Sequence, residues 1–287
     1  MNFELLFQLL LNGLIVATLY GVVAMCFVLI YKSTQIVNFA QGEFLLIGAW
    51  VCYAFLVEMH MPFWMGFLFT LLFMMVFGIV LQMVVLRPMI GEPIISVIMV
   101  TIGLSIFFQA ATYPQVFETR SVNLLGMQIE TAYIMSFVIS LFIMAGFYWF
   151  FKYSKLGLAM RATAFDQQVA QSLGISVKTV FAMSWAISAL VSGVAGIVIG
   201  MVNGVSSALS VIGIKVFPAV ILGGLDSIVG AIVGGVIIGL LENTAEFVDG
   251  QYLHWGNLFS IAPFYVLIII LCIKPYGLFG TKDIERI

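Results

Sequence analysis

The chain has 287 residues, of which 63% are hydrophobic and only 8% are charged, and its formal net charge is −2. A soluble domain is about 45–50% apolar and about 25% charged, so this composition excludes a water-soluble fold. The 11 Lys and Arg residues are spread out singly or in pairs and leave no basic surface for nucleic acid. We therefore expect residues 1–287 to form a single transmembrane domain surrounded by lipid.

Stretches without charged residues mark where the chain can cross a bilayer, because a charge at the bilayer centre costs about 2.5–3.5 kcal/mol. A spanning segment must satisfy its own backbone hydrogen bonds in lipid, which favours helices. The sequence therefore predicts an all-α, polytopic integral membrane protein with eight or nine transmembrane or re-entrant helical segments. The charge-free runs cover residues 5–31, 44–57, 59–86, 93–117, 131–151, 179–214, 227–241 and 250–273.

The positions of Lys and Arg predict the orientation, since short cytoplasmic loops carry an excess of positive charge. With the N-terminus outside, Arg120 and Lys215 are the two basic residues left outside. This orientation places the loop at 152–178 in the cytoplasm. The nine residues on the inside are Lys32, Arg87, Lys152, Lys155, Arg161, Lys178, Lys274, Lys282 and Arg286.

The region 217–241 allows two interpretations, because residues 223–227 interrupt an otherwise apolar run. It contains either two crossings, the first supplied by residues 205–224, or a broken hairpin that enters and leaves on one side. Lys215 favours the hairpin, since a span over 205–224 would place its charge at mid-membrane. Both interpretations remain open, which gives the eight or nine segments.

Two segments are unusually polar or glycine-rich for a bilayer. The segment 35–43 has amides and a carboxylate before a short apolar run, and 222–230 has glycines flanking a carboxylate. Broken helices beside a cavity free backbone groups to bind a polar solute, whereas cytoplasmic surface loops use the same residues in turns and caps. The spacing of the polar residues and glycines is compatible with a solute-binding break and with a surface loop. The candidate substrate-path residues are Asn38, Gln41, Gly42, Glu43, Gly223, Gly224, Asp226 and Ser227.

The loop at 152–178 contains a periodic apolar pattern. Residues 157–173 lack Pro and have apolar side chains at spacings of three and four, which predicts a short amphipathic helix ended by Gly174. Such a helix can lie on the lipid surface, cap the bundle or dock into another protein. Its apolar residues are Leu158, Ala162, Phe165, Val169 and Leu173.

Small residues recur every fourth position in two later segments, a pattern that lets helix backbones approach closely. The stripes pack either within one subunit or at a subunit interface. They consist of Ser184, Ser188, Ser192, Gly196 and Gly200, and of the pairs Gly230 with Gly234 and Gly235 with Gly239.

Motifs of enzymes and metal sites are missing from the sequence. It has no GxxxxGK[ST] phosphate loop and no HExxH, and its three Cys residues lack CxxC spacing. We therefore expect neither an enzyme nor a metal site. A transport protein of this kind uses ATP only through another subunit.

Four stretches, in order along the chain, resemble the motifs of one transporter family. The chain is similar to the branched-chain amino-acid permease family, the membrane subunits of bacterial ATP-binding-cassette (ABC) importers, over about residues 10–280. The stretches are IYKSTQIVNFAQGE at 30–43, GLAMRA at 157–162 with Asp166, Ala170 and LGI at 173–175, VILGG at 220–224 with Ser227 and Gly230, and KPYGLFG at 274–280.

This resemblance implies a multi-pass permease subunit in the bacterial inner membrane. It implies a second related permease subunit, a periplasmic solute-binding protein and two cytoplasmic ATPase subunits as partners, with ATP on the ATPases and no cofactor on this chain. The loop at 152–178 then becomes the coupling loop. Ala170 and Gly174 have the spacing of family loops that insert into the ATPase, and Arg161 and Asp166 are the expected polar contacts there.

Three functional alternatives follow. The first is an importer subunit for branched-chain amino acids or related small polar solutes, including amides and urea. The second is an ion-coupled secondary carrier that uses Glu43 or Asp226, since an intramembrane carboxylate is a functional candidate. The third is a scaffold subunit without a path.

Overall fold

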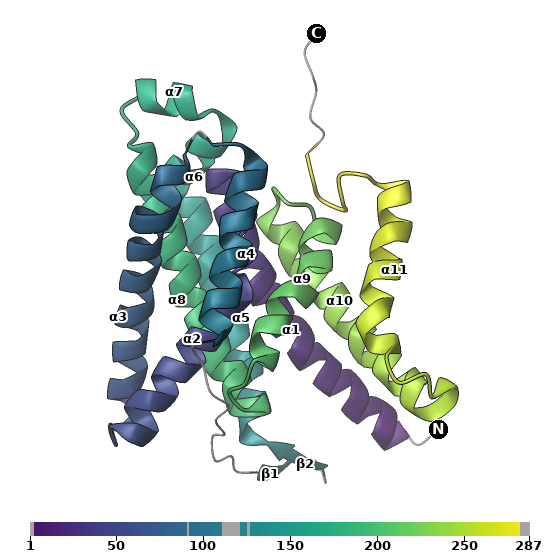
Figure 1. Ribbon diagram of the computed structural model, residues 1–287. Coiled ribbons are helices and arrows are strands. Elements are labelled where there is room, and N and C mark those ends of the chain that lie inside the picture. Colours follow the sequence, from purple (N-terminus) through teal and green to yellow (C-terminus); the bar gives the residue numbers. More distant parts are fainter. Residues whose placement is uncertain (1–2, 91, 111–120, 125–126, 282–287) are drawn as a thin grey trace.

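The computed structural model describes residues 3–90, 92–110, 121–124 and 127–281 (Figure 1). The charge-free run predicted at 93–117 therefore ends outside the described residues. Three of the basic residues used to predict the orientation also lie outside them: Arg120, Lys282 and Arg286. The described chain is a bundle of apolar helices, which confirms the all-α polytopic fold. Six helical segments are long enough to cross a membrane, and three shorter ones are also apolar.

The long helical segments are α1 (Phe3–Thr34), α2 (Gln41–Tyr53) with the π-helical turn η1 (Ala54–Glu58), α3 (Phe63–Leu81) with η2 (Gln82–Leu86) and η3 (Arg87–Met89), α5 (Thr131–Tyr153), α8 (Val177–Asn203), and α10 (Ile228–Val248) with η4 (Asp249–Leu253). The shorter apolar helices are α4 (Ile94–Ala110), α9 (Ala208–Gly223) and α11 (Leu258–Ile273). Two further short helices, α6 (Lys155–Phe165) and α7 (Gln167–Ser172), lie at one end of the bundle, at the top of Figure 1. We call this the α6–α7 end.

The opposite end carries a small antiparallel hairpin of β1 (Ser121–Leu124) and β2 (Met127–Glu130), in which Ser121 pairs with Glu130 (Figure 1). An open two-stranded sheet does not occur within the hydrocarbon of a bilayer, so this hairpin lies outside the membrane-spanning part of the chain.

The ambiguous segment contains a separate helix over most of 205–224. Gly204, with a φ of 76°, ends α8, and α9 follows as a helix of 16 residues. Lys215 is tolerated within this apolar helix because it forms an ion pair with Glu242 of α10. The argument from Lys215 against a full crossing assumed an unpaired charge, and the ion pair removes that premise; the choice between two crossings and a hairpin stays a prediction.

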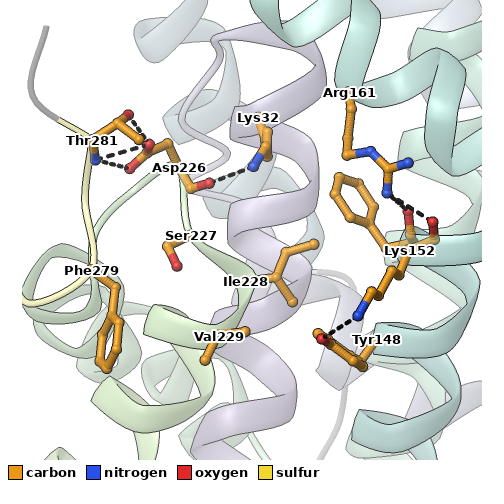
Figure 2. Close-up of a pocket in the computed structure, with 11 residues that line it drawn as sticks. Lys32, Tyr148, Lys152, Arg161, Asp226, Ser227, Ile228, Val229, Phe279 and Thr281 are labelled. Carbon is orange, nitrogen blue, oxygen red and sulfur yellow. Dashed lines mark hydrogen bonds between the residues drawn. The ribbon is translucent and has the colours of Figure 1, made fainter.

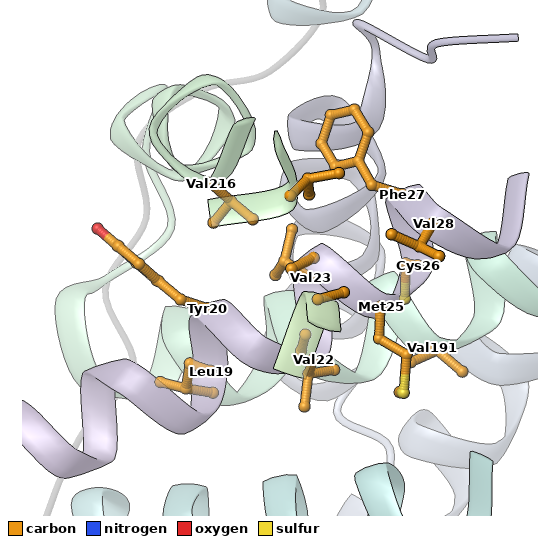
Figure 3. Close-up of a cluster of buried hydrophobic side chains, with 14 of the residues drawn as sticks. Leu19, Tyr20, Val22, Val23, Met25, Cys26, Phe27, Val28, Val191 and Val216 are labelled. Atoms are coloured by element: carbon orange, nitrogen blue, oxygen red, sulfur yellow. The ribbon is translucent and has the colours of Figure 1, made fainter. Parts of the chain in front are cut away.

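Helices α1, α2 and α8 form the centre of the bundle, and most of their residues are buried. Small residues make this packing possible: a Cβ on Gly196 would overlap the carbonyl oxygen of Leu45, and a Cβ on Gly235 would overlap the backbone of Gly21. The small-residue stripes thus pack within the chain. Figure 3 shows α1 side chains clustered with Val191 of α8 and Val216 of α9.

The predicted single helix over 157–173 was wrong, because α6 and α7 are separate helices. Asp166 interrupts them: its backbone is extended, and its carboxylate accepts hydrogen bonds from the backbone N–H groups of Gln168 (2.8 Å) and Val169 (2.9 Å). This capping competes with a continuous helix. The expected stop at Gly174 is confirmed, since it follows α7 with a φ of 83°.

Candidate functional site

The segment between α1 and α2 is a non-helical stretch that is exposed at Gln35 and buried at Asn38 and Ala40. After Thr34, Gln35 has a φ of 57°, and helical geometry resumes only at Gln41. Asn38, Ala40 and Gln41 are fully buried. Non-helical backbone at membrane depth is tolerated only where protein or a wetted cavity surrounds it, so this stretch needs polar partners.

Those partners come from hydroxyl groups at the middle of α8. The Gln41 side-chain N–H donates to Ser192 Oγ (2.5 Å), and Gln41 Oε1 accepts from Asn38 Nδ2 (3.1 Å) and Ser188 Oγ (3.3 Å). Asn38 Oδ1 accepts from the backbone N–H of Ala40 (3.1 Å). Because Ser188 and Ser192 lie near the centre of a 27-residue helix, the break lies at about mid-bilayer depth. We call Asn38, Gln41, Ser188 and Ser192 the amide cluster.

Glu43 lies two residues after Gln41 on α2 and is 2% exposed. Its Oε1 accepts a hydrogen bond from Ser105 Oγ of α4 (2.8 Å), whereas its Oε2 has no partner within the described residues. Gly42 packs directly on the backbone of Ser210 in α9. A buried carboxylate oxygen that accepts no hydrogen bond costs free energy. It can accept a hydrogen bond from a bound solute.

The second predicted segment lies at the α6–α7 end and has a different role in the packing. Gly224, with a φ of 109°, and Ser227, whose Oγ accepts from the Gly230 N–H (3.0 Å), form the turn between α9 and α10. The Asp226 carboxylate accepts from the backbone N–H (3.1 Å) and the hydroxyl of Thr281. Gly223 O accepts from the Phe279 N–H (3.0 Å). This turn therefore anchors the C-terminal segment, and the structure does not place it beside the amide cluster.

The four predicted coupling residues lie on α6, α7 and the turns that flank α7. Arg161 Nη1 donates to the carbonyls of Phe151 (2.5 Å) and Lys152 (3.1 Å), so this group holds α6 to the end of α5. Ala170 is buried, and Asp166 and Gly174 bound α7. The outward surface of α6, α7 and the turn after them has exposed apolar side chains among polar ones: Phe165 is 94% exposed and Leu173 is 74% exposed, and Gln168 and Gln171 are exposed beside them.

The sequence interpretation missed an intramembrane charge pair. Lys215 of α9 forms an ion pair with Glu242 of α10, and Glu242 Oε2 accepts a hydrogen bond from the Tyr20 hydroxyl of α1 (2.6 Å). Lys215 Nζ also lies 5.0 Å from the ring centre of Phe259. A signal was present, because two charge-free runs end at Lys215 and Glu242, but the 27-residue separation concealed their contact.

These features define a class: a polytopic membrane protein whose helices surround a buried polar break at mid-depth. The family model described as "Branched-chain amino acid transport system / permease component" matches residues 9–271. The chain belongs to this family, the branched-chain amino-acid permeases of ABC importers. It is therefore an inner-membrane transport permease component and not an enzyme.

Curated relatives match nearly the whole chain. BraD, the high-affinity branched-chain amino acid transport system permease protein of Pseudomonas aeruginosa, is 30% identical and covers 98% of this chain and 97% of its own. LivH of Escherichia coli K12, with the same description, is 28% identical with the same coverage. A chain of PsaBC from Streptococcus pneumoniae in complex with Fab has a similar fold, with a TM-score of 0.50, 18% identity, and coverage of 92% of this chain and 91% of that one.

Proposed function

We propose that this chain is one permease subunit of an ATP-driven importer for branched-chain amino acids or related small polar solutes. It forms half of the translocation path and pairs with a second related permease subunit. A periplasmic solute-binding protein delivers the solute, and two cytoplasmic ATPase subunits bind the ATP. Nearly full-length similarity to BraD and LivH supports this assignment, as does family membership.

The observation that carries the path is the buried break beside Glu43. A branched-chain amino acid at neutral pH has an ammonium group, a carboxylate and an apolar side chain. The unpartnered Glu43 Oε2 offers an acceptor for the ammonium group, and the amide cluster offers donors and acceptors that can exchange partners. Asn38, Gln41 and Gly42 shape this region, whereas Gly223, Gly224, Asp226 and Ser227 shape the cytoplasmic end of the path.

Uptake of radiolabelled leucine by the reconstituted full importer tests the path. We expect Glu43→Gln to reduce uptake at least about tenfold, because one lost charge-assisted hydrogen bond contributes about 1.5–3 kcal/mol. The matched control is Glu58→Gln, on an exposed residue at the end of η1, which should transport normally. Normal uptake by Glu43→Gln contradicts its role in the path.

Asn38 provides a second test of the path, separate from assembly. Asn38→Ala removes a donor to Gln41 and the acceptor for the Ala40 N–H, so transport should change. Association with the ATPase subunits, measured by co-purification, should not change. An Asn38→Ala importer with normal transport removes this residue from the proposed path.

The second part of the proposal concerns coupling: the exposed apolar surface of α6 and α7 docks into the ATPase and transmits its motion. Phe165→Ala should lower substrate-stimulated ATPase activity and uptake together. Phe142→Ala, a matched control, changes an exposed Phe in the middle of α5 and should leave both unchanged. Equal behaviour of the two variants contradicts docking through Phe165.

Asp166 tests the same coupling through charge. Asp166→Lys should uncouple uptake from ATP hydrolysis while the subunit still assembles in the membrane. The cause is the loss of the α7 cap together with charge reversal in the coupling loop. Uptake at the normal rate by this variant refutes the coupling role.

An ion-coupled secondary carrier makes a different prediction from the importer. If the ion gradient is collapsed while ATP is held constant, a carrier stops and an ATP-driven importer continues. Asp226 is a weak candidate for an intramembrane ion site, because its carboxylate is engaged by Thr281 at the α6–α7 end.

A further inference from the structure

A cavity of about 300 Å³ lies at the α6–α7 end, apart from the amide cluster. Three cationic side chains line it, and each comes from a different helix: Lys32 from α1, Lys152 from α5 and Arg161 from α6 (Figure 2). Asp226 is the carboxylate on its wall. The cavity therefore has an excess of positive charge.

The carboxylate forms no ion pair with these cations. Lys32 Nζ donates to the backbone carbonyl of Asp226 (2.8 Å), while the carboxylate accepts from Thr281 (Figure 2). Within the described residues, the one ion pair is Lys215 with Glu242, outside this cavity. The three cations are thus gathered without an ion-pair partner, although like charges repel one another.

The aromatic ring of Phe151 lies close to two of them. Lys32 Nζ is 5.6 Å and Arg161 Cζ is 5.7 Å from its ring centre, and such contacts are attractive. The described hydrogen bonds of Arg161 use only Nη1, although a guanidinium has five N–H donors. Lys152 is exposed and bonds to the Tyr148 hydroxyl (3.4 Å). Donors therefore remain for an anion with several oxygens.

The rim of the cavity is suited to a lipid. On α5, Trp149 and Tyr153 follow the lining residues Tyr148 and Lys152 in the sequence and are 66% and 64% exposed, which is typical of the membrane–water interface. Ile228 and the exposed Val229 add apolar wall. An apolar, aromatic rim next to basic residues suits a molecule with a phosphate and acyl chains better than a free anion.

We infer that this cavity binds the phosphate of an anionic phospholipid headgroup and thereby ties α6 to α1 and α5. Phosphate oxygens match the cations, and the acyl chains follow the apolar surface of α5. Since α6 leads into α7, the lipid holds the proposed coupling region against the bundle. Binding itself does not depend on the proposed function.

The test measures binding of phosphatidylglycerol to the purified full-length chain in detergent by native mass spectrometry. Lys152→Gln removes one lining cation from an exposed position, and Lys155→Gln makes the same change on a neighbouring exposed residue outside the cavity. We expect about fivefold weaker binding for Lys152→Gln and unchanged binding for Lys155→Gln. Equal effects of the two substitutions overturn the inference.

Two further ligands distinguish the source of the phosphate. Phosphatidylcholine, which has no net charge, should bind much more weakly than phosphatidylglycerol. Inorganic phosphate should not compete with phosphatidylglycerol at millimolar concentration. Equal binding of the two lipids, or competition by inorganic phosphate, overturns an anionic lipid as the occupant. Lys32→Gln with Lys152→Gln should abolish the preference for phosphatidylglycerol.

Discussion

The two polar segments that look alike in the sequence have different surroundings in the structure. In 35–43, the polar side chains bond to hydroxyls of α8 and α4 that are 151 and 62 residues away. In 222–230, the polar groups bond within their own turn, to the C-terminal segment and to Lys32 of α1. Glycines and carboxylates therefore give a buried break in one place and an anchoring turn in the other.

The difference depends on what packs against each segment. Ser188 and Ser192 present hydroxyls at mid-depth, so an interrupted helix there can satisfy its amides without water. The 222–230 turn instead meets a chain end that supplies backbone N–H groups. Substitutions in the interior should consequently have larger effects than substitutions in the turn.

The largest effect is expected at Gly42. A Cβ there would overlap the carbonyl oxygen of Ser210 and lie 2.8 Å from its carbonyl carbon, so Gly42→Val should cost more than about 3 kcal/mol and prevent correct folding. Gly146→Val is the matched control, since a Cβ at Gly146 meets nothing within 4 Å. The measurement is the yield of monodisperse protein from membranes. Comparable yields would show that α2 and α9 do not pack as described.

The next effect is expected at the intramembrane ion pair. Lys215→Met leaves the Glu242 carboxylate buried with Tyr20 as its partner, which should cost about 3–5 kcal/mol. The double variant Lys215→Met with Glu242→Met removes both charges and should recover most of that stability. Thermal unfolding in detergent measures the stability of the single and of the double variant. A double variant as unstable as the single one would show that the charge is not the cause.

The positions of the helices could be predicted from the sequence, because charge-free runs long enough to span a bilayer become helices. The break in the helix at Asp166 could not be predicted, because the apolar spacing of 157–173 fits one helix or two. The capping hydrogen bonds of the Asp166 carboxylate determine that there are two. The pairing of Lys215 with Glu242 depends on how α9 and α10 pack. The candidate residues of the path were found by composition, whereas Ser188 and Ser192 were interpreted only as packing residues.

A smaller effect is expected where the C-terminal segment meets the turn. Asp226→Asn weakens the acceptor for the Thr281 N–H and hydroxyl, and it should lower stability by about 1 kcal/mol. Its readout is faster proteolysis of the C-terminal segment at an unchanged yield of protein. Asp166→Asn, which changes a carboxylate that bonds to the backbone of α7 instead, should leave this cleavage rate unchanged. Equal cleavage in the two variants would show that Asp226 does not hold the segment.

The smallest effect is expected at Ser227, which caps α10. Ser227→Ala removes the acceptor for the Gly230 N–H, and a lost N-cap costs about 1 kcal/mol or less at a partly solvated helix end. Ser172→Ala is the control, because its hydroxyl bonds only to the Val169 carbonyl in the same helix. Thermal unfolding should separate the two variants by a few degrees. A loss of stability in Ser227→Ala as large as that in Lys215→Met would contradict the contrast between interior and turn. It would mean that the turn stabilises the fold as much as the buried interior does.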